Sequence, residues 1–101
     1  MTIARAPGLY RIVNRVNRKS YIGSSTNLLK RWGAHLSALR PGKHDNGHLQ
    51  RAWDKYGEGA FVFNVLLICE PKQLVRYEAA LLTKWKPEYN ICLQARSRKG
   101  I

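Results

Sequence analysis

The run of sequence that most constrains the fold is AFVFNVLLIC, from Ala60 to Cys69. Only Asn64 interrupts its apolar character, so both sets of alternating side chains are hydrophobic. A strand that is apolar on both faces is typical of the interior of a sheet that is covered by helices. The run therefore predicts a buried, central strand in a protein that combines strands with helices.

The N-terminal part of the chain supplies the strands that would pair with it. Residues 8–14 alternate in character as a half-buried strand does, and residues 20–23 form a second short extended segment. The polar stretch 15–19 between them is typical of a turn. We therefore predict a hairpin, which would bring Tyr10 and Tyr21 close together.

Three helices are expected in the rest of the chain. The first covers about residues 27–39, the second follows a cap at Asp45 or Asn46, and the third begins at Pro71 and ends near Trp85. The apolar face expected of the first helix consists of Leu28, Leu29, Trp32, Leu36 and Leu39. The predicted class is α+β, a three-stranded, mainly antiparallel sheet flanked by about three helices in the order β-β-α-α-β-α.

The length of 101 residues predicts a single domain, with a core of about residues 7–93 and a basic tail at 94–101. The first residues lack the apolar segment of a signal peptide, and no apolar run is long enough for a membrane helix. Cys69 and Cys92 are not part of a C-x-x-C pair. We therefore expect reduced thiols and a cytoplasmic location, in a bacterium or a phage host.

The charge balance indicates the partner. Eighteen Lys and Arg residues face six Asp and Glu residues, which gives a net charge of +12. Such a surface binds a phosphate backbone by releasing counterions, so we expect double-stranded DNA as the partner. A membrane is not expected, because no basic amphipathic helix with a wide apolar face is present. The residues expected to contact DNA are Lys30, Arg40, Lys43, His48, Arg51 and Lys55.

Glu78 is the most unusual acidic residue, because its helical neighbours are Leu74, Leu81 and Leu82. A partly desolvated carboxylate needs a partner, which would be either a basic side chain or a divalent cation. A site that holds two metal ions needs several clustered carboxylates, and the sequence has no such cluster. If Glu78 binds metal, the chemistry that the sequence supports is therefore a single hard ion such as Mg²⁺.

Arg31 and His35 are four residues apart on the first predicted helix, so their side chains share a face. We expect this face to point away from the apolar one, where it would either bind phosphate or remain a solvated surface. His44 and His48 have a spacing that occurs in zinc sites, but the cysteines are wrongly spaced to complete one. A phosphate contact or a catalytic role is the favoured interpretation of His44.

These residues resemble the signature of the GIY-YIG endonuclease family. Gly8-Leu9-Tyr10 and Tyr21-Ile22-Gly23 are similar to its two tripeptides, with Leu in place of the usual Ile. Arg31, Glu78 and the pair Tyr89-Asn90 follow in the family's order, so the resemblance covers Pro7 to Ile91. The stretch from His44 to Phe61 is most similar to the branch of phage and intron-homing enzymes. Those enzymes resemble the chain only in their catalytic part.

The resemblance implies hydrolysis of DNA phosphodiester bonds with one divalent ion, Mg²⁺ or Mn²⁺, and no small-molecule cofactor. It implies that Glu78 holds the ion and that Arg31 stabilises the pentavalent phosphorane. Tyr10 would orient the attacking water or act as its general base, and Tyr21 would assist. The remaining implied site residues are His35 and His44, for proton transfer or phosphate binding, and Asn90, which would organise the site. We expect a monomer that is able to dimerise transiently.

Two alternatives remain open from the sequence. A catalytically inactive nucleic-acid-binding module would explain the positive charge without any role for Glu78. A repair or restriction nuclease on the same scaffold would keep the chemistry and differ in the DNA that it prefers.

Overall fold

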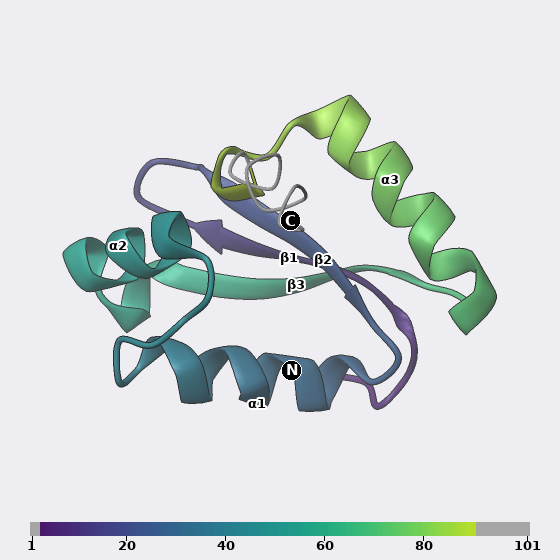
Figure 1. The fold of residues 1–101 in the computed structure, drawn as a ribbon, viewed down its shortest axis with the longest axis horizontal. Helices are drawn as coiled ribbons and strands as arrows, with labels where there is room; N and C mark the ends of the chain where they lie inside the picture. Colours follow the sequence, from purple (N-terminus) through teal and green to yellow (C-terminus); the bar gives the residue numbers. More distant parts are fainter. Residues whose placement is uncertain (1–2, 91–101) are drawn as a thin grey trace.

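The computed structural model describes residues 3–90, so Cys92 and the predicted tail at 94–101 lie outside the described residues. The sheet consists of three antiparallel strands, β1 (Gly8–Asn14), β2 (Ser20–Ser25) and β3 (Phe61–Ile68). Three α-helices accompany them, α1 (Leu28–Leu39), α2 (Gly47–Tyr56) and α3 (Leu74–Trp85). In Figure 1, the sheet lies between α1 and α3, and α2 lies near the end where β3 begins. The predicted class and element order are confirmed.

The central strand is β1, because the strand order is β2-β1-β3. The prediction that the apolar run at 60–69 forms a central strand is therefore wrong, since β3 lies at an edge. Phe61 and Phe63 are buried, but Leu67 and Ile68 near its other end are 39% and 52% exposed. Side-chain alternation reports the two faces of a strand and not its edges. A run that is apolar on both faces therefore does not establish that a strand has a neighbour on each side.

The two faces of β1 pack against different helices, so this strand is largely buried and not half-buried as its alternation suggested. Tyr10 and Ile12 belong to the main core, together with residues of α1 and α2 that include Leu28, Leu39 and Trp53. On the other face, the Arg11 guanidinium lies over the ring of Trp85 in α3, 5.4 Å from its centroid. The helices thus cover both faces of a thin sheet, with α1 and α3 on opposite sides.

The helices begin at side chains that accept backbone hydrogen bonds. Asn27 accepts one from Lys30 N at 3.1 Å, and Asn46 accepts one from Leu49 N at 3.0 Å. These contacts satisfy N–H groups that a helix leaves unpaired at its first turn. A short 3₁₀ turn at Pro71–Gln73 precedes α3. Within residues 3–90, no helix has both the length and the apolar character that crossing a bilayer requires.

Candidate active site

Tyr10 of β1 is the point on which two residues of α1 converge. Its hydroxyl lies 2.6 Å from His35 Nε2, and Arg31 Nε donates a hydrogen bond to it at 3.4 Å. Arg31 and His35 can reach the same oxygen because residues four apart lie one turn apart on a helix. The expectation that these two side chains act on one face is consistent with this geometry.

His35 differs from the expectation, because it is 1% exposed and belongs to the buried stripe of α1 with Leu28 and Leu39. The expected position of this residue, on a face turned away from the core, is therefore wrong. The polar ring is tolerated there because the Tyr10 hydroxyl supplies a hydrogen-bond partner. Burial lowers the pKa of His35 to about 3, with smaller contributions from the Arg31 and His44 charges. The imidazole is therefore neutral at physiological pH.

His44 joins the site from the loop between α1 and α2. Its Nε2 lies 2.8 Å from His35 Nδ1, and the two rings stack with their centroids 5.0 Å apart. Burial is also the main reason that the pKa of His44 is lowered. His48 instead meets the ring of Tyr89 edge-on, at 5.0 Å. Within residues 3–90 no group of three or more metal-binding side chains exists, so the structure gives no support to a zinc site at the two histidines.

A polar cavity of about 280 Å³ lies beside this cluster. Tyr21 borders the cavity and is partly exposed, whereas Tyr10 is 1% exposed and is not among the lining residues. The two phenol rings lie 6.4 Å apart, as the predicted hairpin requires. A molecule in the cavity would therefore contact Tyr21 and Arg31, and not Tyr10. The other polar residues that line it are His35, Lys43, His44, Asp45 and Asn46.

Two glycines of the tripeptides leave space that a side chain would fill. A Cβ at Gly23 would overlap the Tyr10 hydroxyl, so the ring can lie across β2 only because this position has no side chain. A Cβ at Gly8 would overlap the backbone carbonyl oxygen of Leu67 in β3. These close approaches give a physical reason for a glycine at each position.

The pKa of Tyr10 is raised above its ordinary value of 10. Burial is the largest cause, followed by the neighbouring Tyr21, while the hydrogen bond and charge of Arg31 act in the opposite direction. The charge of Glu78 raises this pKa further. Tyr10 is therefore a neutral phenol at physiological pH in the free domain, and Glu78 is close enough for its charge to act on it.

Glu78 of α3 is half-buried and accepts a hydrogen bond from the Ser24 hydroxyl at 2.6 Å. Alternation along β2 places Ser24 on the α3 face and Gly23, which Tyr10 crosses, on the α1 face. Glu78 and the phenols thus approach the edge strand β2 from opposite sides. Within residues 3–90 no basic side chain forms an ion pair with Glu78, so the alternative of a salt bridge is not supported there.

This carboxylate suits one hard cation that keeps most of its water. One oxygen of Glu78 accepts the Ser24 hydrogen bond, which fixes the orientation of the carboxylate. A magnesium ion in such a setting takes one or two protein carboxylates and completes its shell with water and phosphate oxygens. The lone acid therefore fits a single ion, and the described residues do not offer the clustered acids that a two-ion site needs.

Asn90 organises the site from behind β2. Its side-chain oxygen accepts a hydrogen bond from Ile22 N at 2.7 Å, and its side-chain nitrogen donates one to Ile22 O at 2.9 Å. These are the bonds that a neighbouring strand would make to the free edge of β2. Because Ile22 lies between Tyr21 and Gly23, Asn90 positions both residues of the second tripeptide without lining the cavity.

The six residues expected to contact DNA occupy different surroundings. Lys43 borders the cavity, and the exposed Lys30 precedes Arg31 on α1. His48, Arg51 and Lys55 are spaced three and four residues apart, so they share a face of α2. The guanidinium of Arg40 is already paired with the carboxylate of Glu58, at 3.0 and 2.7 Å. Contacts with DNA remain a prediction for all six.

Sequence reasoning missed Ser24 and the backbone amide of Asn46. Ser24 orients the carboxylate of Glu78, and the Asn46 amide donates to His44 Nδ1 at 3.0 Å. The signal for Ser24 was its position one residue beyond the second tripeptide, on the face of β2 that α3 covers. No sequence signal identified the Asn46 amide, because any residue except proline would supply the same N–H.

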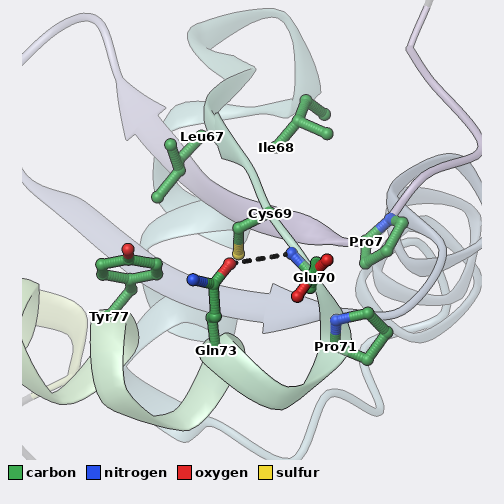
Figure 2. A pocket seen from close by; sticks show the side chains of 8 residues that line it. All are labelled: Pro7, Leu67, Ile68, Cys69, Glu70, Pro71, Gln73 and Tyr77. Atoms are coloured by element: carbon green, nitrogen blue, oxygen red, sulfur yellow. Dashed lines mark hydrogen bonds between the residues drawn. The ribbon is translucent and has the colours of Figure 1, made fainter.

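A second hollow, of about 670 Å³, lies where β3 leads into α3 (Figure 2). Pro7, Cys69 and Pro71 are among its lining residues, and none of the candidate site residues is. The dashed line in Figure 2 is the bond from Glu70 N to the side-chain oxygen of Gln73, 3.2 Å long. This bond is part of the capping box of the 3₁₀ turn, so the polar groups there have a structural role.

Arg31, Tyr21 and two neutral histidines border a polar cavity, Tyr10 lies behind them, and the Glu78 carboxylate lies across the edge strand β2. The chain belongs to the GIY-YIG family, because the model of the GIY-YIG catalytic domain matches residues 6–90. It is thus an endonuclease domain.

Similar proteins agree with this membership. The chain is 34% identical over 87 residues to intron-associated endonuclease 1 of Enterobacteria phage T4, and 39% identical over 56 residues to probable intron-encoded endonuclease 1 of Neurospora crassa. These alignments cover 82% and 55% of this chain but only 33% and 17% of the two relatives. The chain therefore spans a small part of the length of these relatives.

Two solved structures share the fold. The catalytic domain of the homing endonuclease I-TevI is 30% identical to this chain and superposes with a TM-score of 0.70, covering 77% of this chain and 86% of that one. A mutant of the same catalytic domain gives a TM-score of 0.71 with the same identity, over 77% of this chain and 81% of that one. The matched part of this chain thus covers most of that solved catalytic domain.

Proposed function

We propose that this chain is a single catalytic module that hydrolyses phosphodiester bonds of double-stranded DNA with one divalent ion, Mg²⁺ or Mn²⁺. The observation that carries the proposal is the Arg31–Tyr10–His35 cluster beside a polar cavity, with Glu78 across β2 and free of any basic partner within residues 3–90. The module would comprise residues 1–101, with its core at about 7–93.

Each side chain has a role that its position supports. Arg31, which borders the cavity, would bind the scissile phosphate and stabilise the charge that develops on it. Tyr21 would contact the same phosphate or the attacking water. Tyr10 would orient that water or act as its general base, and its raised pKa favours the first role. Asn90 would hold β2, and with it Tyr21, in place.

The divalent ion would be held by Glu78, whose carboxylate Ser24 orients. When bound, such an ion supplies Lewis-acid stabilisation to phosphate and leaving-group oxygens. Lys43 borders the cavity beside Arg31, where it would attract the DNA backbone. The remaining predicted DNA contacts would extend the basic surface around that cavity. We propose no membrane partner and no small-molecule cofactor for this module.

The wider context of the module is part of the proposal. Two relatives are named as intron endonucleases, which favours a homing role in a phage or its bacterial host. The basic composition and the expected reduced cysteines are consistent with action on DNA in the cytoplasm. A monomer holds one such site, so cutting both strands would need a transient dimer or a second binding event.

A plasmid-cleavage assay tests this function. We expect the chain to nick supercoiled plasmid in Mg²⁺ or Mn²⁺, and to stop in excess EDTA. Glu78→Gln should bind DNA as tightly as the parent chain and cleave at least ~100-fold more slowly, within the range of losses for transition-state contacts. Glu70→Gln, at an exposed acid outside the cavity, is the control and should cleave normally. Cleavage that survives in EDTA would exclude the metal mechanism.

The alternatives would give different outcomes in the same assay. An inactive binding module would bind DNA tightly and in a salt-sensitive manner, but it would produce no strand breaks in any divalent metal. A repair nuclease on this scaffold would prefer damaged or branched DNA to plasmid, and a restriction enzyme would cut at one short sequence.

A further inference from the structure

A continuous chain of hydrogen bonds connects a backbone amide to the phenol of Tyr10. Asn46 N donates to His44 Nδ1 at 3.0 Å, and His44 Nε2 lies 2.8 Å from His35 Nδ1. His35 Nε2 lies 2.6 Å from the Tyr10 hydroxyl. Four groups from β1, α1 and the following loop are thus connected in series. Only the Asn46 amide, at one end, must act as a donor in its bond.

The fixed donor determines the direction of the whole series. A neutral imidazole has one N–H and one acceptor nitrogen. Because His44 Nδ1 accepts the Asn46 N–H, the proton of His44 must be on Nε2. His44 then donates to His35 Nδ1, so the proton of His35 must also be on Nε2, where it donates to Tyr10. The lowered pKa values of both histidines support their neutral forms.

We propose that the Asn46 amide sets the protonation pattern of the His44–His35 pair, and that His44 is a positioning residue that keeps His35 donating a hydrogen bond to the Tyr10 oxygen. The opposite direction, with Tyr10 donating to His35, would place an N–H on His44 Nδ1 facing the Asn46 N–H. Two donors would then oppose each other across 3.0 Å, without an acceptor. This inference rests on the proposed nuclease function for its catalytic consequence, but not for its geometry.

The consequence concerns the proton of Tyr10. In this pattern its oxygen accepts N–H groups from both His35 and Arg31, so its own O–H is donated to neither of them. Because Tyr10 is 1% exposed and does not line the cavity, an attacking water or phosphate oxygen would have to pass beyond the cavity lining to accept the phenol proton. The histidine pair cannot take this proton while His35 Nε2 already carries one. If Tyr10 ionises during turnover, the same two N–H groups stabilise the phenolate.

The protonation pattern can be measured without DNA or metal. Long-range ¹H–¹⁵N correlation spectra of the ¹⁵N-labelled chain at neutral pH distinguish the two neutral forms of each imidazole. We expect His35 and His44 to show protonated Nε2 and unprotonated Nδ1, with His48 as the internal reference outside the series. Protonated Nδ1 on either ring, or a doubly protonated ring, would overturn the inference and leave the nuclease proposal untouched.

A pair of variants then separates positioning from packing. His44→Gln keeps a side-chain N–H that can donate to His35 Nδ1, whereas His44→Leu has no donor. We expect His35 to keep protonated Nε2 in the Gln variant and to become a mixture in the Leu variant. The Leu variant should lose roughly 2- to 10-fold in kcat with little change in KM, as for a lost hydrogen bond between neutral groups, and the Gln variant clearly less. Equal losses of kcat in the two variants, with the protonation pattern of His35 unchanged in both, would show that His44 contributes only packing.

Discussion

Three side chains of the candidate site, those of Glu78, His44 and Tyr10, owe their placement to a neighbouring residue. Ser24 orients the carboxylate of Glu78, and the amide of Asn46 orients His44. The missing side chain at Gly23 lets the Tyr10 ring lie across β2. Groups that are held by such contacts lose less freedom when substrate binds, which is a general requirement of efficient catalysis.

Replacing Ser24 by Ala tests whether this orientation matters for metal binding. The variant keeps Glu78 and removes only the hydroxyl that donates to it at 2.6 Å. Removing a partner that orients a metal ligand typically costs 10- to 100-fold in affinity, so we expect the Mg²⁺ concentration for half-maximal cleavage to rise by about tenfold. A Mg²⁺ titration of plasmid cleavage measures this half-maximal concentration.

The control for that titration is Ser37→Ala, at an exposed position of α1. It should leave the Mg²⁺ requirement unchanged. The same requirement in the Ser24 variant as in the parent chain would show that the hydroxyl does not orient a metal ligand.

Among the elements, β2 is the one on which the site depends. It carries Tyr21, Gly23 and Ser24, yet it is an edge strand. β1 lies on one side, and on the other the side chain of Asn90 bonds to Ile22 and that of Glu88 accepts from Ser20 N. Edge strands are otherwise exposed to fraying or to pairing with other chains. The η3 turn (Glu88–Asn90) therefore takes the place of a fourth strand beside the second tripeptide.

Replacing Asn90 tests this role of β2. Asn90→Ala removes two hydrogen bonds to buried Ile22, and we expect a loss of about 2–3 kcal/mol in the free energy of unfolding. Asn90→Asp keeps the acceptor for Ile22 N and removes the donor to Ile22 O. It should therefore retain the first hydrogen bond and place a second acceptor opposite Ile22 O. Thermal unfolding followed by circular dichroism would show a Tm lower by roughly 10 °C or more in the Ala variant. An unchanged Tm would mean that the edge of β2 does not need these bonds.

Local sequence signals predicted the elements well and their arrangement less well. Asn27 and Asn46 begin the first two helices because capping is a property of adjacent residues. The place of β3 at an edge depends on which strands pair across the chain, and its apolar run carries no information about that. His35 was expected on the outer face of α1 because it is polar, but its partner, Tyr10, is 25 residues away in sequence.

Over the whole molecule, basic residues far outnumber acidic ones, and several of the acidic side chains already have a partner within the chain. Of the six Asp and Glu residues, Glu58 is paired with Arg40, Glu70 with Lys72, and Glu78 with the Ser24 hydroxyl. The total charge predicted DNA as the partner, because counterion release depends on charge and not on fold. It could not show that Arg40 is engaged by Glu58, or that Tyr21 and not Tyr10 borders the cavity.

The buried histidines predict how stability depends on pH. The pKa of His35 is about 3 in the folded chain and 6.5 when unfolded, so between these values the unfolded chain binds a proton that the folded chain does not. Stability is therefore fully present above about pH 6.5 and falls as the pH decreases, by up to ~1.4 kcal/mol per pH unit for this group. His44 shifts in the same direction.

Urea unfolding at about pH 7.5 and about pH 5 measures this dependence. We expect the parent chain to lose about 2 kcal/mol more than His35→Gln between the two conditions. His48→Gln, which leaves the buried pair intact, should lose as much as the parent chain. The same loss in His35→Gln as in the parent chain would contradict a neutral, buried His35.

The central claim is that one divalent ion binds at Glu78, across β2 from Arg31 and the two phenols. The anomalous diffraction of a crystal soaked in Mn²⁺ tests it most directly, because it locates the ion without relying on activity. We predict one strong anomalous peak in contact with the Glu78 carboxylate, and no peak at that place in Glu78→Gln crystals. A peak at a different acid, or a saturated soak with Glu78 bound only to Ser24, would contradict the account.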